Sequence, residues 1–237
     1  MITHLDLFSG IGGFSPGLQE TGKFKTIAHA EVAPFPSKVL ARHWPNVPNL
    51  GDVEKADFPH ADFITAGFPC HDISNAGKRA GITGERSGLF REVVRAIRMA
   101  RPICTLLENV AALLGRGMGN VLGDLAEIGN DAEWDCIPSC YVGAWHERDR
   151  IWILTYPGCE RDGQRQPTQS VFRQSDLSRQ PSRVFAKWPG RSNLPAPTLH
   201  RGANGLSAEL DSHGNAIIPQ IAEAWGHAVA REFFPHA

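Results

Sequence analysis

The sequence predicts an α/β fold, in which a mostly parallel sheet carries helices on both of its faces. Two observations lead to this prediction: short apolar, β-prone runs alternate along the chain with helical segments, and polar residues recur where those runs end. The 237 residues, 42% of them hydrophobic and 21% charged, are enough for one good-sized core.

The chain opens with a strand, a glycine turn and a helix. Residues 3–8 are apolar enough for a short buried strand, residues 9–13 form the turn, and residues 14–21 are helical, with Gly22 as the stop. This order is typical of the first crossover of a nucleotide-binding, Rossmann-like sheet, where glycines let the backbone approach a ligand. The G-x-G-G spacing does not favour a dinucleotide, and a turn that is merely tight is the alternative.

Three further strands are expected before residue 70, over residues 25–31, 49–52 and 63–69, with a helix over residues 34–44. Glu31 ends the first of them, about twenty residues after the glycine turn, where nucleotide-binding units place a ribose-binding carboxylate. Asp52 ends the second. Either acid could also be an ordinary surface carboxylate.

The most informative stretch is the strand 63–69 together with Cys70, which follows it. The strand is apolar and is ended by a glycine and a proline, so it delivers one thiol to the edge of the sheet. Residues 75–88 then contain four glycines and three basic residues, which indicates a mobile cationic loop beside a candidate nucleophile. A buried, inert thiol is the alternative.

After that loop we expect helices over residues 89–100 and 121–128 and strands over residues 104–110, 134–139 and 151–156. Glu108, near the end of the strand 104–110, could bind a ligand or cap a helix. In open α/β sheets, ligands gather at the carboxyl ends of the strands. The polar residues at such ends therefore predict one site; they are Ser9, Gly10, Glu31, Asp52, Cys70 and Glu108.

Residues 157–204 differ in composition, with much Pro, Gln, Ser and Arg. They carry eight basic against three acidic residues, whereas residues 1–156 carry 15 against 18 and residues 205–237 carry one against four. That asymmetry is expected of a nucleic-acid-facing insert, although a solvated loop would show it too. Helical periodicity returns over residues 217–234. We therefore divide the chain into a body (1–156), an irregular insert (157–204) and a C-terminal segment that completes the body (205–237).

The composition argues against several classes of protein. No basic-then-apolar leader begins the chain and no apolar run reaches membrane-spanning length, so we expect a cytoplasmic protein without a membrane partner. The five cysteines are scattered, which indicates reduced thiols, and the lone C-x-x-x-C of Cys136 and Cys140 lacks the second ligand pair of a zinc site. We expect no metal, and a monomer.

With these pieces together, the sequence resembles the cytosine-5 DNA methyltransferases of bacteria and their phages. The resemblance covers most of the chain outside residues 157–204 and rests on five motifs in the family's order. They are Asp6-Leu7-Phe8-Ser9-Gly10-Ile11-Gly12-Gly13, Gly67-Phe68-Pro69-Cys70, Glu108-Asn109-Val110, Arg148 with Arg150, and Gly214-Asn215-Ala216 through Pro219. His71 and Trp145-His146 depart from the family's usual residues, and typical members have a longer recognition region.

The resemblance implies a class I S-adenosylmethionine-dependent fold and methyl transfer to carbon 5 of a cytosine flipped out of double-stranded DNA. Cys70 would attack carbon 6 of the ring, Glu108 would act on ring nitrogen 3, and Arg148 would hold the base or its phosphate. The implied cofactor-binding residues are Phe8, Ser9, Gly10, Gly12, Gly13, Glu31, Asp52, Pro69 and Asn215. The implied nucleic-acid contacts are Ser74, Lys78, Arg79, Arg86, Ser87 and Arg150.

Two alternatives stay open. The same chemistry could act on structured RNA, because a basic insert does not discriminate between nucleic acids. The chain could also be a non-catalytic binder of cofactor and DNA that needs a partner, because the insert is a reduced target-recognition region. The complete set of motifs favours the enzyme, and with it a place in restriction–modification.

Overall fold

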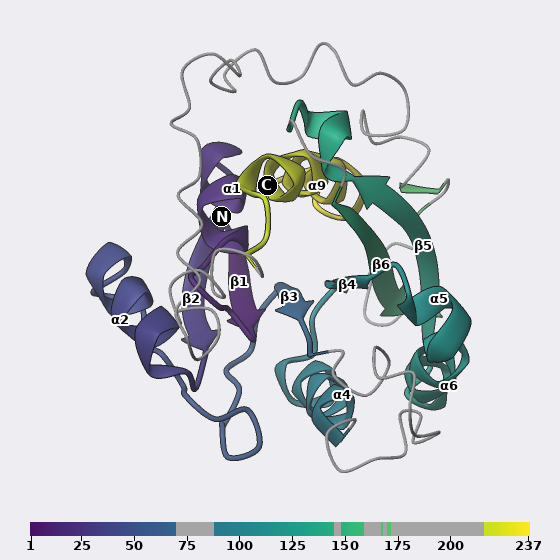
Figure 1. Cartoon of the computed structure of the whole chain (residues 1–237), viewed down its shortest axis with the longest axis horizontal. Helices are drawn as coiled ribbons and strands as arrows, with labels where there is room; N and C mark the ends of the chain where they lie inside the picture. Colours follow the sequence, from purple (N-terminus) through teal and green to yellow (C-terminus); the bar gives the residue numbers. More distant parts are fainter. Residues whose placement is uncertain (70–87, 145–147, 159–166, 168–169, 172–215) are drawn as a thin grey trace, which may run out of the picture.

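The computed structural model is an open six-stranded sheet with helices on both faces (Figure 1). It describes residues 1–69, 88–144, 148–158, 167, 170–171 and 216–237. The strands are β1 (Ile2–Leu7), β2 (Phe24–Ala30), β3 (Phe63–Gly67), β4 (Cys104–Val110), β5 (Asn130–Pro138) and β6 (Asp149–Pro157), in the spatial order β2-β1-β3-β4-β6-β5.

Of the six strands, only β6 runs against the others. β1 pairs in parallel with β2 and β3, and β3 with β4, whereas β6 is antiparallel to both of its neighbours, β4 and β5. The connection from β5 to β6 is short and contains a 3-10 helix at Ser139–Val142, and a parallel crossover needs a dozen or more residues. The mostly parallel sheet predicted from the sequence is confirmed.

Alternate residues of each strand face opposite layers, which gives the sheet two cores. Leu107 belongs to the core shared with α4 and α6, and its neighbour Leu106 to the core shared with α1 and α9. Figure 1 shows the two helical layers on either side of the sheet. The helices are α1 (Phe14–Glu20), α2 (Pro34–His43), α4 (Gly88–Ala100), α5 (Leu113–Arg116), α6 (Met118–Glu127) and α9 (Pro219–Phe233).

Helices α1 and α9 pack with very little space between them. A Cβ atom on Gly17 of α1 would lie 2.8 Å from the Cβ of Ala222, and one on Gly226 of α9 would lie 2.9 Å from Leu18 Cδ2. Trp225 is fully buried in the same layer. The C-terminal helix is therefore docked on the body, and the helix predicted from the periodicity of residues 217–234 is confirmed.

The predicted strand over residues 49–52 is wrong, because only an isolated bridge joins Asn49 to His29. The Asn49 side chain takes the place of a ladder: its Oδ1 accepts a hydrogen bond from the Glu31 amide (2.9 Å), and its Nδ2 donates to the Glu31 carbonyl (3.0 Å). Gly51 then turns the chain with a φ of +73°. The four-residue helix α5 is also missing from the sequence-based prediction, since one turn is too short to show a period.

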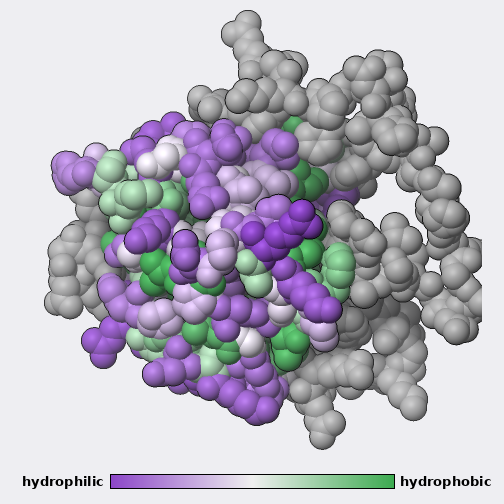
Figure 2. All heavy atoms as spheres, turned by 90° about the vertical axis from the view of Figure 1, so that its left-hand side faces the viewer, coloured by the Kyte–Doolittle hydropathy of each residue, from purple (hydrophilic) through white to green (hydrophobic). Residues whose placement is uncertain are grey.

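The face on the left of Figure 1 is mostly hydrophilic, and its hydrophobic side chains lie in small separate groups (Figure 2). Isolated apolar groups of this kind are normal on protein surfaces. No helix in the described ranges is long and apolar enough to cross a membrane. Within the same ranges, no group of three or more His, Cys, Asp or Glu side chains could hold a metal ion.

Candidate active site

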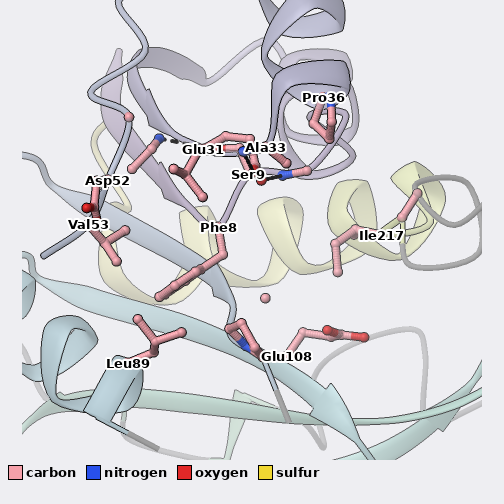
Figure 3. A pocket seen from close by; sticks show the side chains of 17 residues that line it. Phe8, Ser9, Glu31, Ala33, Pro36, Asp52, Val53, Leu89, Glu108 and Ile217 are labelled. Atoms are coloured by element: carbon pink, nitrogen blue, oxygen red, sulfur yellow. Dashed lines mark hydrogen bonds between the residues drawn. The ribbon is translucent and has the colours of Figure 1, made fainter. Parts of the chain in front are cut away.

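A cavity of about 370 Å³ opens where β1, β2, β3 and β4 end (Figure 3). Small-molecule sites occupy roughly 300–1,000 Å³, so this volume suits a small ligand. Phe8 points into the cavity, with Leu89 facing it and Ile217 reaching in from the segment before α9. The residues predicted from the sequence that line the cavity are Phe8, Ser9, Gly10, Glu31, Asp52, Pro69 and Glu108.

The turn after β1 is strained and held on several sides. Phe8 and Gly10 have positive φ angles of +52° and +54°, and such a backbone costs a non-glycine residue on the order of 1–3 kcal/mol. The Ser9 hydroxyl donates to the Asp6 carbonyl (2.7 Å), and the Gly10 amide donates to Glu31 Oε2 (2.8 Å). These bonds fix the turn, and the turn aims the Phe8 ring into the cavity.

Glu31 ties this turn to the start of α2. While Oε2 accepts the Gly10 amide, Oε1 accepts the Ala33 amide at 2.7 Å. A carboxylate has about four lone-pair sites, so each oxygen can accept one more hydrogen bond. Glu31 can therefore receive two ligand hydroxyl groups without releasing the turn.

Asp52 supplies a second carboxylate at another side of the cavity. Its Oδ1 accepts the Glu54 amide (3.0 Å), and its Oδ2 lies 3.4 Å from Lys55 Nζ. The hydrogen bond from the Glu54 amide, and then the Lys55 ammonium, lower the pKa of Asp52. Asp52 is thus an ionised acceptor at neutral pH, suited to an amino group of a ligand.

Glu108 lies at the end of β4, where it lines the cavity and is only 7% exposed. Burial raises its pKa, while the charges of Arg150 and Arg148 lower it. Arg150 Nε is 2.8 Å from Glu108 Oε1. Because burial favours the neutral acid and the guanidinium favours the carboxylate, Glu108 is suited to exchange a proton with a ligand.

Asn109, next to Glu108, holds the segment that follows β3 and leads to Cys70. Its buried Nδ2 donates to the Phe68 carbonyl at 3.1 Å. Pro69 follows and lines the cavity. Sequence reasoning named Asn109 only as part of a motif and missed this bond, since a contact between two strand ends leaves no periodic signal.

Gly12 and Gly13 lie in the same turn but do not line the cavity. A Cβ atom on Gly12 would lie 2.6 Å from the Trp44 ring, and one on Gly13 would lie 2.5 Å from the Ile217 carbonyl oxygen. The two glycines therefore let the turn pack against α2 and against the segment before α9. Any effect of theirs on a ligand would pass through the shape of the turn.

Of the remaining predicted residues, the structure describes Arg148 and does not describe the others. Arg148 is half-buried, its carbonyl accepts the Ser139 amide (3.2 Å) and hydroxyl (3.0 Å), and burial and Arg150 lower the pKa of its guanidinium. Those that lie outside the described residues are Cys70, Ser74, Lys78, Arg79, Arg86, Ser87 and Asn215.

The predicted insert 157–204 is described at only a few positions, and two of these are fixed to β5. The Ser170 hydroxyl donates to Glu133 Oε2 (2.7 Å), and the Val171 amide donates to Glu133 Oε1 (3.0 Å). Val171 is 1% exposed and belongs to the core under α9. This part of the insert packs against the main sheet.

Buried polar side chains connect the strands beneath the β1 turn. His4 Nδ1 lies 3.0 Å from Thr26 Oγ1, and His4 Nε2 lies 2.8 Å from Thr65 Oγ1. The Thr65 hydroxyl in turn donates to Asp6 Oδ1 at 2.7 Å. Burial raises the pKa of Asp6 to about 7 and lowers that of His4 to about 3. Asp6 therefore changes protonation near neutral pH, close to the turn that carries Ser9 and Gly10.

The cavity also has apolar walls that the sequence analysis did not single out. Val32, directly after Glu31, lines the cavity although it is 72% exposed. Val32 and Val53 lie in connections and belong to no period, so only their position beside Glu31 and Asp52 could have found them. The larger of these apolar residues are Val32, Pro36, Val53, Leu89 and Ile217.

Comparison with known proteins gives a consistent result. A family model described as C-5 cytosine-specific DNA methylase matches residues 2–180. The Type II methyltransferase M1.ScrFI of Lactococcus lactis subsp. cremoris is 34% identical over 159 residues, which are 64% of this chain and 41% of that protein. M2.BsuMI of Bacillus subtilis (strain 168) is 35% identical over 159 residues, with 63% and 41% covered. The chain spans about two fifths of the length of these relatives.

Solved structures share the fold. The S. pombe Dnmt2 methyltransferase matches with a TM-score of 0.58 at 16% identity, covering 74% of this chain and 56% of that one. A putative DNA modification methyltransferase encoded within a prophage of E. coli matches with a TM-score of 0.54 at 22% identity, covering 66% and 47%. At these identities the likeness concerns the fold.

Proposed function

Since the chain belongs to the C-5 cytosine-specific DNA methylases, we propose that it transfers a methyl group from S-adenosylmethionine to carbon 5 of a cytosine in DNA. The observation that carries this proposal is that one cavity combines two kinds of residue. The β1 turn, Glu31 and Asp52 offer contacts for a nucleoside, and Glu108, paired with Arg150, offers an acid for a base.

The residues of the cavity fit the cofactor. Glu31 has two acceptor sites left for ribose hydroxyls, and Asp52 offers a carboxylate to the adenine amino group. The carboxylates also suit the positive charge of the sulfonium. When bound, S-adenosylmethionine supplies an electrophilic methyl group. Phe8, Ser9, Gly10 and Pro69 would surround its remaining parts, Gly12 and Gly13 would shape the turn, and Asn215 would close the site.

Cys70 is the proposed nucleophile, because Pro69, the residue before it, lines the cavity. Its thiolate bonds to carbon 6 of the flipped cytosine while Glu108 gives a proton to ring nitrogen 3, which moves an electron pair to carbon 5. Carbon 5 is then the atom that gains the methyl group. Loss of the carbon 5 proton to solvent, departure of the sulfur and return of the nitrogen 3 proton to Glu108 complete the cycle.

We propose different roles for Arg150 and Arg148. Arg150 holds the Glu108 carboxyl group in place through its 2.8 Å contact. Arg148, half-buried beside it, is the arginine that would hold the flipped base or its phosphate. Arg150 would additionally meet the nucleic acid at its exposed side.

Duplex DNA is the proposed partner, and Ser74, Lys78, Arg79, Arg86 and Ser87 are its proposed contacts. Residues 1–156 and 205–237 would form the catalytic body and residues 157–204 a reduced target-recognition insert, an assignment that the anchoring of Val171 to Glu133 supports. The names of the relatives, Type II methyltransferases, support a role in restriction–modification. We propose that the protein acts in the cytoplasm, as a monomer.

Covalent trapping tests the proposal. The protein is incubated with methyl-labelled S-adenosylmethionine and duplex DNA that contains 5-fluorocytosine, which has no carbon 5 proton to lose, so the enzyme should remain bonded to DNA. Cys70→Ser should abolish the adduct, and Cys136→Ser, at a partly exposed thiol outside the cavity, should retain it. Adducts with a tRNA substrate but not with DNA would point to an RNA methyltransferase, and binding of both ligands without any adduct would point to a non-catalytic binder.

A further inference from the structure

Arg95, in the middle of α4, binds the loop of residues 51–58 that brings Asp52 and Val53 to the cavity. Its Nη1 donates to the Ala56 carbonyl (3.0 Å), and its Nη2 donates to the Val53 carbonyl (2.5 Å). The sequence analysis placed this arginine only within a helix expected over residues 89–100.

Further contacts orient the guanidinium. Its Nε donates to Glu92 Oε2 at 2.6 Å, one turn earlier on the same helix, and its central carbon lies 4.7 Å from the centroid of the Phe58 ring. A planar fork can bind two carbonyls and a carboxylate at once while stacking on a ring, and an ammonium group cannot. The site is therefore specific for arginine.

The loop 51–58 needs this anchor for its direction. It contains no strand or helix, and the hydrogen bonds within it go to Asp52: the Asp52 carbonyl accepts the Lys55 and Ala56 amides, both at 3.0 Å, and Asp52 Oδ1 accepts the Glu54 amide at 3.0 Å. Phe58 and its apolar neighbours add packing, which is not directional. Arg95 supplies directional contacts between this turn and the body of the protein.

Helix α4 is itself a wall of the cavity, because Leu89 in its first turn lines it. Arg95 lies six residues, or about 9 Å, further along the helix axis. In Figure 3 the Phe8 ring lies between Val53, beside Asp52, and Leu89. Arg95 thus joins two walls of one cavity, one on the helix and one on the loop.

We propose that Arg95 is a positioning residue for the cofactor: it sets the distance between α4 and the loop that presents Asp52 and Val53 to the adenine. This inference rests on the proposed function, since it assigns this side of the cavity to S-adenosylmethionine. Loss of Arg95 should weaken cofactor binding while leaving Cys70, Glu108 and the DNA contacts as they are.

The test measures cofactor binding by calorimetry and, separately, kcat and the two KM values for methylation of duplex DNA. Arg95→Met and Arg95→Lys should each raise the Kd and KM for S-adenosylmethionine about tenfold, with kcat at saturating cofactor and the KM for DNA within twofold of wild type. Glu92→Gln, which loosens the guanidinium but leaves it in place, should have a smaller effect of the same kind. Arg98→Met, at an exposed arginine of the same helix, is the matched control and should change nothing.

A merely structural role would give a different pattern. If Arg95→Lys, which retains the apolar stem on Phe58, lowers kcat as much as it raises the cofactor KM, or leaves the KM unchanged, the positioning role is wrong while the proposed function stands. If the wild-type protein binds no S-adenosylmethionine, both are wrong. Melting temperatures of the variants show whether the protein measured is folded.

Discussion

Glu108 and Arg150 meet because β6 runs antiparallel to β4. The register pairs Glu108 with Trp152 and Val110 with Arg150, so that Arg150 is the diagonal neighbour of Glu108 on the same face of the sheet. The resulting Nε–Oε1 distance is 2.8 Å. The one reversed strand of the sheet therefore delivers a cation to the buried acid of the site.

Arg150→Met should shift the pH dependence of the proposed methylation. The charge of Arg150 lowers the pKa of Glu108 against the effect of burial, so its removal leaves the pKa higher. If the protonated acid is the active form, kcat/KM falls as pH rises through this pKa, and the fall should move to higher pH in the variant. The measurement is kcat/KM for methylation of duplex DNA over a range of about pH 6 to pH 9.

Arg148→Met is the matched comparison for that experiment. Arg148 also lowers the pKa of Glu108, but after Arg150 in size, so the same limb should move less. A profile for Arg150→Met that overlays the wild-type profile after scaling would show that Glu108 does not set the limb.

Glu31→Ala should weaken cofactor binding by roughly 10- to 100-fold, the effect of losing one to two charged hydrogen bonds. The substitution removes both proposed ribose contacts and frees the Gly10 and Ala33 amides. Calorimetric titration with S-adenosylmethionine measures the Kd. Glu20→Ala, at an exposed acid at the end of α1, controls for the loss of charge. Equal affinity of the Glu31 and Glu20 variants would remove Glu31 from the cofactor site.

Much of the fold follows from local pattern. Buried strands and amphipathic helices leave a period in the sequence, and the rule for strand ends then collects Glu31, Asp52 and Glu108 in one cavity. Prediction from local pattern fails where side-chain hydrogen bonds take the place of backbone hydrogen bonds. The side-chain amide of Asn49 binds the backbone of Glu31. The segment 49–52, which the sequence predicts to be a strand, therefore makes only one β-bridge.

The contacts that position the site leave no such pattern. Arg95 looks like any solvent-facing arginine of an amphipathic helix, and its partners are backbone carbonyls about forty residues earlier, as two hydrogen bonds in the structure show. Gly12 and Gly13 belong to a turn whose ligand-binding character the sequence indicates, yet their space is taken by Trp44 and Ile217. Long-range packing decides such roles, and only the folded chain reveals them.

Gly17→Ala should destabilise the protein by roughly 2–4 kcal/mol, a range typical of overpacking and backbone displacement in a tight core. The new Cβ would collide with the Pro219 carbonyl oxygen and lie 2.8 Å from Ala222 Cβ, and backbone cannot move aside as a flexible side chain can. Gly123→Ala, in α6 with nothing within 4 Å of the new atom, should instead be neutral or stabilise by up to about 1 kcal/mol. Denaturant unfolding measures both. A Gly17 variant as stable as wild type would show that α9 does not pack on α1 in this way.

Asp6→Asn should become more stable relative to wild type as pH rises from 4 to 7. The pKa of Asp6 is about 7 in the folded protein against an ordinary value of 3.8, so between these limits the folded state binds a proton that the unfolded chain does not. Stability from this group is therefore present at low pH and is lost as pH rises through about 7. Asparagine cannot ionise and avoids that loss. Since one pKa unit corresponds to about 1.4 kcal/mol, the difference in unfolding free energy between Asp6→Asn and wild type should change by a few kcal/mol over this pH range.

The comparison between variant and wild type isolates Asp6 from the other buried groups of the layer. Burial lowers the pKa of His4 to about 3 and of His29 to about 4, so each of them adds stability as pH rises towards 6.5, opposite in sign to Asp6. Both histidines are present in both proteins, and their contributions cancel in the difference. Unfolding free energies of both proteins at several pH values give that difference. A flat line for Asp6→Asn would mean that Asp6 is ionised in the fold throughout, and that the bond from Thr65 outweighs its burial.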